Sequence, residues 1–268
     1  MTEPHSSQTD YSRYFSLKQK AYLINMSDER NRDHFESLSG VIVNRHADLV
    51  ELQIPYTTGQ ESPGSATEKV TYKLTTEALG VGLQMLADLI KVTAGNVFHL
   101  RLHGNLEIYQ RRKTQRIETN IKLFHLRQNF PLAIYRKEFK RITDYMKAQG
   151  LPPNLKLREA AVNLSMGGIR LEIEAQEQPS PLSMFFLEVD DKLPPICAVA
   201  EAAWERREGE RIICGHRFIH ILKADQERIN RHVQAVQKQL GITAASTKTN
   251  WELLDRMTFE GPEPKRAR

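Results

Sequence analysis

Cysteine is scarce in this chain of 268 residues, which contains only Cys197 and Cys214. Two cysteines are too few for a disulfide framework or for a zinc site built from four thiolates. A free cysteine in a strand usually behaves as a small buried hydrophobic residue. We therefore expect both thiols to be buried and to have no chemical role.

Long apolar runs are also missing. No uninterrupted apolar stretch approaches the ~20 residues that a membrane-spanning helix needs. Residues 1–10 are polar and contain neither the basic region nor the apolar core of a secretion signal, so we expect a disordered lead. With 40% hydrophobic and 26% charged residues, the composition is that of an ordinary globular protein. These features predict a cytoplasmic protein without a membrane span.

The sequence shows no recognisable catalytic constellation. Ser165 lacks the Gly-x-Ser-x-Gly frame of hydrolases, and no pair of carboxylates stands near it in the sequence. His216 and His220 could face the same way on a strand, but two histidines without a third ligand make a poor metal site. Trp204 and Trp251 are isolated, and Trp204 is expected in a core. We therefore expect no enzyme, no metal and no stacking platform for single-stranded RNA.

Positive charge is concentrated at particular places. The net charge of +5 and the isoelectric point near 9.1 favour anionic partners without choosing among a dinucleotide, RNA and a lipid surface. One basic cluster covers residues 111–116, and a second ends the chain at 265–268. The second cluster follows Pro262 and Pro264, which predicts a solvated tail over residues 243–268.

The length predicts two domains, since single domains usually contain ~100–150 residues. In the first half, residues 11–109, short β-prone runs alternate with turns, which predicts a small antiparallel barrel. Residues 79–92 have apolar side chains at helical spacing, but Gly80 and Gly82 would each cost a helix ~1 kcal/mol relative to alanine. We therefore expect a strand there, followed by a hairpin that ends at Gly104.

The second half, residues 110–242, predicts another small barrel with two helices. Tyr135, Phe139, Ile142 and Met146 recur at helical spacing, which predicts an inserted helix at about 131–150. A last helix is expected to begin near Asp225. The expected strands are 117–126, 158–164, 169–174, 183–189, 196–204 and 211–222.

Two arginines in the connection between the halves are separated by four positions. Arg112 and Arg116 can each grip a phosphate with paired donors, lie flat on a purine, or fork onto the O6/N7 edge of guanine. Arg111 stands beside them and either flanks a ligand or faces water. The spacing leaves room for one arginine on a phosphate and the other on a base, so this segment suits a phosphorylated guanine ligand.

A polar turn follows later in the chain, where Asn163-Leu164-Ser165-Met166-Gly167-Gly168 separates two expected strands. Glycines reach the positive φ values that many reversals of the chain require. Asn163 and Ser165 have short side chains that bond either their own backbone or a ligand. A side chain at Gly168 would also stand where a flat base might approach, so we expect this hairpin to form the second half of a binding site.

At these residues the chain resembles the PilZ family of bacterial cyclic di-GMP receptors. Arg112 and Arg116 fall on the family's Arg-x-x-x-Arg positions, and Asn163, Ser165 and Gly168 fall on its Asp/Asn-x-Ser-x-x-Gly positions. The run 215–218 is similar to the family's late Gly-x-x-Phe strand. The region before residue 110 looks like the amino-terminal barrel of flagellar-brake-type members. Residues 130–153 depart from the pattern, because they are longer than a minimal PilZ domain needs.

The resemblance implies a mainly β protein with two small antiparallel barrels, and a non-enzymatic receptor that binds cyclic di-GMP without a metal. It implies outputs in motility, biofilm formation or exopolysaccharide control through a protein partner such as the flagellar motor or exopolysaccharide machinery. We expect domain rearrangement from the position of the arginines, because a ligand held by both the connection and the second barrel would order the connection. The interdomain contacts are expected to be small. Two alternatives stay open, a barrel that binds nucleic acid and a PilZ-like adaptor without ligand. The expected ligand-binding residues are Arg111, Arg112, Arg116, Asn163, Ser165, Gly167 and Gly168.

Overall fold

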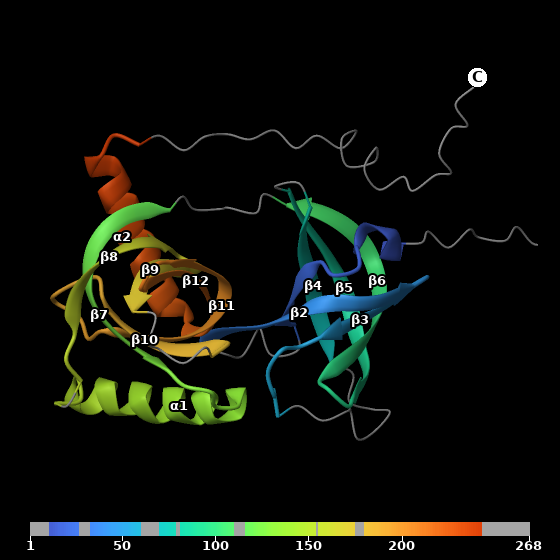
Figure 1. The fold of residues 1–268 in the computed structure, drawn as a ribbon, viewed down its shortest axis with the longest axis horizontal. Coiled ribbons are helices and arrows are strands. Elements are labelled where there is room, and N and C mark those ends of the chain that lie inside the picture. Colours follow the sequence, from blue (N-terminus) through green and yellow to red (C-terminus); the bar gives the residue numbers. More distant parts are fainter. Residues whose placement is uncertain are drawn as a thin grey trace, which may run out of the picture.

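The described residues form two closed antiparallel barrels of six strands each, with one helix beside and one across the second barrel (Figure 1). The computed structural model describes residues 11–26, 33–59, 70–78, 81–109, 116–153, 155–174 and 180–242. The mainly β fold with two small barrels, an inserted helix and a C-terminal helix is therefore confirmed. Among the described helices, none is long and apolar enough to cross a membrane.

The first barrel follows a short 3₁₀ turn, Tyr11–Tyr14, and closes because its first two strands pair with each other. Alternate side chains of each strand point to opposite faces, so one set fills the interior. Phe98, Leu100 and Leu52 belong to this buried set. Around the barrel the strands are β1 (Lys20–Asn25), β4 (Thr71–Ala78), β5 (Val81–Thr93), β6 (Val97–Tyr109), β3 (Leu49–Gln53) and β2 (His34–His46).

The expected end of a hairpin at Gly104 is wrong, because β6 continues to Tyr109. Gly104 has a φ of +79° and lies where the pairing of β5 and β6 shifts register between Gln84 and Leu86. The glycine therefore permits an irregularity inside a long strand instead of ending it. Residues 81–93 are a strand, as their glycines suggested. A Cβ at Gly82 would lie 2.5 Å from the Tyr109 ring.

The second barrel closes through pairing of β9 with β12. Helix α2 (Lys223–Gln239) buries Ile229 and Val233 against the interior of this barrel. Helix α1 (Leu132–Gln149) follows β7 and presents Tyr135, Phe139 and Met146 to the core. Around the barrel the strands are β7 (Ile117–Arg127), β8 (Arg158–Ser165), β9 (Gly168–Glu174), β12 (Arg211–Leu222), β11 (Ile196–Glu208) and β10 (Leu182–Glu188).

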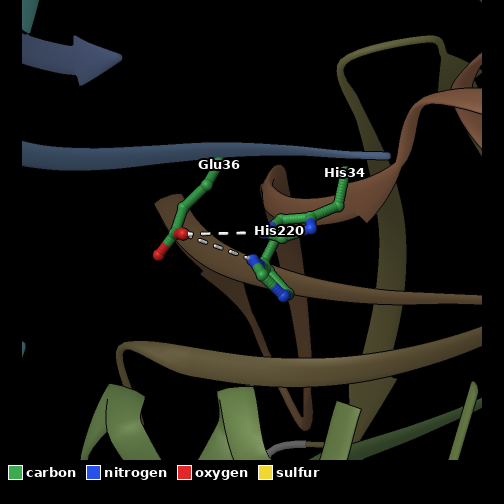
Figure 2. A group of neighbouring side chains, drawn as sticks. All are labelled: His34, Glu36 and His220. Atoms are coloured by element: carbon green, nitrogen blue, oxygen red, sulfur yellow. Dashed lines mark ion pairs between the residues drawn. The ribbon is translucent and has the colours of Figure 1, made fainter. Parts of the chain in front are cut away.

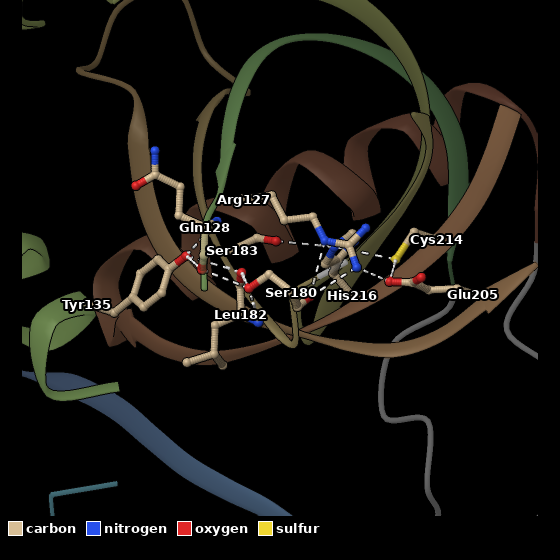
Figure 3. Close-up of polar contacts among 9 residues, drawn as sticks. All are labelled: Arg127, Gln128, Tyr135, Ser180, Leu182, Ser183, Glu205, Cys214 and His216. Carbon is tan, nitrogen blue, oxygen red and sulfur yellow. Dashed lines mark hydrogen bonds and ion pairs between the residues drawn. The ribbon is translucent and has the colours of Figure 1, made fainter. Parts of the chain in front are cut away.

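A polar network anchors the first turn of α1 to the second barrel (Figure 3). The Tyr135 hydroxyl donates to the Gln128 carbonyl over 2.8 Å and also contacts the Leu182 carbonyl at 3.2 Å. The Ser180 hydroxyl reaches the same Gln128 carbonyl at 2.7 Å. Arg127 donates twice to the Ser180 carbonyl and pairs with Glu205. The network fixes where α1 starts after β7 ends.

The two barrels share a strand pairing. Strand β2 belongs to the first barrel, and its first residues pair with the end of β12 in the second, with Glu36 opposite His220 and His34 opposite Leu222. The buried face of α1 also packs in one continuous core with side chains of the first barrel. The expectation of small interdomain contacts is therefore wrong, because neither a shared strand nor a shared core is visible in local sequence patterns.

A buried carboxylate adds a polar link between the barrels. The side chain of Glu201, on β11, is only 2% exposed and pairs with Lys20 of β1 at 2.6 Å. Its other oxygen accepts from the Ser39 hydroxyl and, at 3.2 Å, from the Tyr56 hydroxyl. Burial, followed by the Glu201 charge, raises the pKa of Tyr56, so the phenol stays protonated as a donor. Removing this carboxylate would leave buried donors of the first barrel without their acceptor.

Candidate functional site

The hairpin between β8 and β9 has a loop of two residues, Met166 and Gly167. Ser165 and Gly168 are paired across it, and the Ser165 hydroxyl donates to the Gly168 carbonyl over 3.2 Å. The Gly167 carbonyl accepts from the backbone N–H of Phe218 at 3.0 Å. The loop is thus held on one side by its own serine and on the other by β12.

The reason for glycine at this turn differs from the sequence-based expectation. Neither Gly167 nor Gly168 has a positive φ, so the expected left-handed backbone is wrong for both. A Cβ at Gly168 would instead collide with the carbonyl oxygen of His216 and lie 3.2 Å from the Cα of Arg217. At Gly167 a Cβ would meet no described atom within 4 Å. Gly168 is required because β9 and β12 approach each other closely here.

A carboxylate joins Asn163 to an arginine that the sequence analysis missed. The Asn163 Nδ2 donates to Glu118 Oε1 over 2.7 Å, and Arg170 pairs with the same oxygen at 2.5 Å. The three residues lie on β8, β7 and β9, where Asn163 is opposite both Glu118 and Arg170. No sequence motif singled out Arg170, and only its pairing with Asn163 in the sheet shows that it lies beside this residue. Because Arg170 offsets the Glu118 charge, an anion can approach this edge of the barrel.

Arg116 lies next to the same hairpin. It directly precedes Ile117, the first residue of β7, whose partner on β8 is Leu164. The main chain at Arg116 therefore lies beside Ser165, where β8 enters the turn, and the Arg116 side chain is exposed. Arg111 and Arg112 lie outside the described residues. The structure thus brings Arg116, Asn163, Ser165, Gly167 and Gly168 to one end of the second barrel.

The other end of the arginine-bearing connection is fixed by Tyr109, the last residue of β6. Burial raises the pKa of the Tyr109 phenol, and the Arg217 charge acts against this rise, so the two groups are within electrostatic range. Arg217 is paired with Gly168 on β9. Its guanidinium lies 3.6 Å from the ring centroid of Tyr22, on β1 of the first barrel. Arg217 therefore contacts the first barrel from a position beside the hairpin.

The histidines of β12 do not share a face. His216 lies against Phe185 and Ser183, whereas His220 lies against Phe139 of α1. The pairing with β11 shifts register between Val199 and Ala200, opposite residues 218–220, and this irregularity reverses the alternation of side chains. The sequence-based expectation that both histidines face one way is therefore wrong.

The sequence-based expectations for the two cysteines are confirmed, and the expectation for Trp204 is wrong. Cys197 and Cys214 are free and buried, as expected, and burial raises the pKa of the Cys197 thiol. Trp204 was expected in a core, but it is 44% exposed, and this expectation is wrong. Its indole covers Gly215 on the neighbouring strand, where any Cβ would collide with the ring.

A known domain family matches part of the second half of the chain. Residues 135–235 match the model of the PilZ domain family. The matched segment contains the β8–β9 hairpin and β12, and it begins after Arg116 and β7. A search of curated proteins finds no match to the chain.

Three solved structures can be aligned with most of this chain at low similarity. The Bacillus subtilis inhibitor of motility, MotI/DgrA, is 11% identical and covers 85% of this chain and 100% of its own, with a TM-score of 0.33. K. pneumonia MrkH is 14% identical over 90% and 97% of the two chains, with a TM-score of 0.35. YcgR from Escherichia coli, solved with c-di-GMP, is 10% identical over 89% and 88%, with a TM-score of 0.29. Likeness at this level does not transfer a function.

Proposed function

Since this chain contains a PilZ domain over residues 135–235, we propose that it is a non-enzymatic receptor for cyclic di-GMP. The proposed site combines the arginine-bearing connection with the β8–β9 hairpin. Its residues are Arg111, Arg112, Arg116, Asn163, Ser165, Gly167 and Gly168.

One observation carries the proposal: Arg116 lies next to the end of β8 that contains Asn163 and Ser165, although it precedes them by 47 and 49 positions in the sequence. A guanidinium beside a polar hairpin can pair with a phosphate while the hairpin offers acceptors and donors to a base. With its Nδ2 directed to Glu118, Asn163 presents its amide oxygen as an acceptor for the N–H groups of guanine.

The site supports binding without a reaction. The Ser165 hydroxyl donates to the Gly168 carbonyl and so closes the turn. A serine nucleophile needs a neighbouring base to take its proton, and the described partner of Ser165 is a backbone carbonyl. We therefore assign Ser165 to ligand positioning.

We also propose that occupancy of the site changes how the barrels are held together, and that a protein partner in motility, biofilm or exopolysaccharide control responds to this change. Arg217 supports this step, because it pairs with Gly168 in the hairpin and contacts Tyr22 in the first barrel. A ligand that attracts the Arg217 guanidinium would weaken the contact with Tyr22. The ligand can shift the arrangement only by its difference in affinity for the two states.

Calorimetry with cyclic di-GMP tests the proposal directly. Purified chain should release or absorb heat on titration with cyclic di-GMP, and GMP at the same concentration serves as the matched control. Absence of binding at ligand concentrations far above the micromolar range would contradict the receptor assignment. A PilZ-like adaptor that binds no ligand would then be the favoured alternative.

Salt dependence separates a receptor from a barrel that binds nucleic acid. A ligand with two phosphates releases few counterions, so its affinity should fall only slightly between 50 and 200 mM salt, whereas a protein on a polyanion loses roughly 10³–10⁵ in affinity over that range. A steep loss with an RNA or DNA oligomer, together with no binding of cyclic di-GMP, would favour the nucleic-acid reading.

A further inference from the structure

Three potential metal ligands meet where the two barrels join, and none of them belongs to the proposed nucleotide site. His34 and Glu36 are two positions apart on β2 and therefore share a face. His220 lies on β12 opposite Glu36 in the strand pairing. Figure 2 shows the three side chains converging, and their ligand atoms all lie within 4.8 Å of one another.

We propose that His34, Glu36 and His220 bind a divalent transition-metal ion, for which Zn²⁺ is the best match. Glu36 Oε2 lies 3.9 Å from His34 Nε2 and 3.8 Å from His220 Nδ1. In a tetrahedral zinc site with bonds of ~2.0–2.2 Å, ligand atoms are separated by roughly 3.3–3.5 Å. These two separations have to close by about half an ångström each, and the two histidine nitrogens, which lie within 4.8 Å of each other, by up to about 1.5 Å, which side-chain rotation can supply.

The ligand types select the class of metal. Two neutral imidazoles and one carboxylate form the His₂Glu set found in zinc enzymes, with a fourth position left for water. Calcium and magnesium prefer six or more oxygen ligands, and this group offers one carboxylate. The three side chains also line a cavity of about 840 Å³, which provides room for a water in the fourth position.

Arg136 of α1 supports this use of Glu36. Its Nε donates to Glu36 Oε1 over 2.5 Å, while the other carboxylate oxygen, Oε2, is the one nearest both histidines. The same guanidinium donates to the Thr58 carbonyl at 3.0 Å, so its position is fixed from two sides. Outer partners of this kind orient a ligating carboxylate. Arg136 contacts Oε1, so its contact with Glu36 does not occupy the oxygen nearest the histidines.

The position in the fold gives the site a structural consequence. The pairing of β2 with β12 joins the two barrels, and the proposed ligands come from both of these strands. Phe139 of α1 packs against the His220 ring with centroids 4.4 Å apart, which covers one side of the group. A bound ion would therefore bridge the two barrels. This inference does not depend on cyclic di-GMP.

The experiment uses tag-free full-length protein that has been treated with a chelator and dialysed. We expect calorimetry to show one Zn²⁺ per chain, Co²⁺ to give the visible absorption of a tetrahedral site, and Zn²⁺ to raise the melting temperature. In the variant H34A/H220A the Co²⁺ band should disappear, and Zn²⁺ affinity should fall by more than the ~10–100-fold that loss of an outer partner costs. His46→Ala, an exposed histidine on the same strand, is the matched control and should bind like the parent.

Two outcomes overturn the proposal. The first is a parent protein that is folded by circular dichroism but takes up no Zn²⁺ or Co²⁺ at 100-fold molar excess. The second is an H34A/H220A variant that binds with unchanged stoichiometry and affinity. If the double variant does not fold, Glu36→Gln and His34→Gln are used separately, since each removes one ligand and keeps most of the side-chain volume.

Discussion

At the scale of single residues, Arg116 and Asn163 are the clearest tests of the proposed receptor. We expect Arg116→Ala and Asn163→Ala each to weaken cyclic di-GMP binding. Losing a hydrogen bond to a charged group typically costs ~1.5–3 kcal/mol, or about one to two decades in affinity, and the loss at Asn163 should be smaller. Calorimetric titration measures both.

Arg206 provides the matched control for these variants. It pairs with Glu208 at 2.6 Å on β11, and both side chains are largely exposed. Arg206→Ala should bind cyclic di-GMP as the parent does. Equal losses in all three variants would indicate a general effect of charge and would contradict a specific site at the hairpin.

The two adjacent glycines of the turn should respond differently to one added methyl group. Gly168→Ala places a Cβ against the carbonyl of His216, and overpacking of this kind typically costs ~1–3 kcal/mol. Gly167→Ala points toward no described atom within 4 Å and should be close to neutral. Thermal or urea unfolding without ligand measures both free energies. If the two variants have similar stability, the close approach of β12 does not explain why glycine is needed at position 168.

His216 should make stability depend on pH. Burial, with smaller effects from the Arg127 and His125 charges, lowers the pKa of His216 to about 3. In the unfolded chain the His216 imidazole takes up a proton near pH 6.5, whereas in the fold it stays neutral down to about pH 3. The free energy of unfolding should therefore decrease by up to ~1.4 kcal/mol per pH unit as pH falls from about 6.5 toward 3. Above about pH 6.5 the imidazole is neutral in both states, so His216 causes no further change in the free energy of unfolding.

The variant His216→Gln removes this titration and should flatten the decline in the free energy of unfolding between pH 7 and pH 4. His46→Gln alters an exposed histidine and should keep the parent's slope. An equal decline in the parent and in His216→Gln would contradict a lowered pKa of His216 in the fold.

At the scale of elements, the attachment of α1 depends on the Tyr135 hydroxyl. Tyr135→Phe removes its bonds to the carbonyls of Gln128 and Leu182, which keep the Ser180 hydroxyl as a donor, and it removes the oxygen that accepts from the Gln128 N–H. Each hydrogen bond lost typically costs ~0.5–1.5 kcal/mol. We expect a lower free energy of unfolding in urea. Tyr145→Phe, a partly exposed position on the same helix, should change stability little. The opposite ranking would mean that the network does not anchor the helix.

At the scale of the whole molecule, the barrels should move relative to each other when ligand binds. Fluorescent labels at Lys91→Cys on the first barrel and Lys192→Cys on the second would report the distance, since both positions are exposed and both native cysteines are buried. We expect saturating cyclic di-GMP to change the transfer efficiency, and Arg217→Ala to reduce this change. The extensive junction predicts a small displacement.

Unchanged transfer efficiency, in a sample that calorimetry shows to be saturated, would contradict the switch. The ligand-bound surface itself would then be the signal that a partner recognises. Arg217→Ala separates these outcomes, because it removes the contact with Tyr22 and keeps the main chain that pairs with Gly168.

Periodicity and turn chemistry were enough to determine much of this protein. They predicted the two barrels, the inserted helix and the C-terminal helix, because side-chain alternation and helical spacing are local properties. The strand expected at 79–92, which the structure shows over residues 81–93, was predicted from its glycines against a helical spacing of apolar side chains. They also selected Asn163, Ser165, Gly167 and Gly168, which the structure brings into one hairpin with Arg116 beside it. The roles of these residues in ligand binding stay predictions, as do those of Arg111 and Arg112.

Only the tertiary structure decided features that depend on which strands meet. Pairing brought Arg170 to Asn163, placed the Gly168 backbone against β12, and put His34 and Glu36 beside His220. An irregularity opposite Val199 and Ala200 separated the two histidines of β12, which simple alternation had placed together. Register and long-range pairing are set by the whole barrel, so no local window of the sequence contains them.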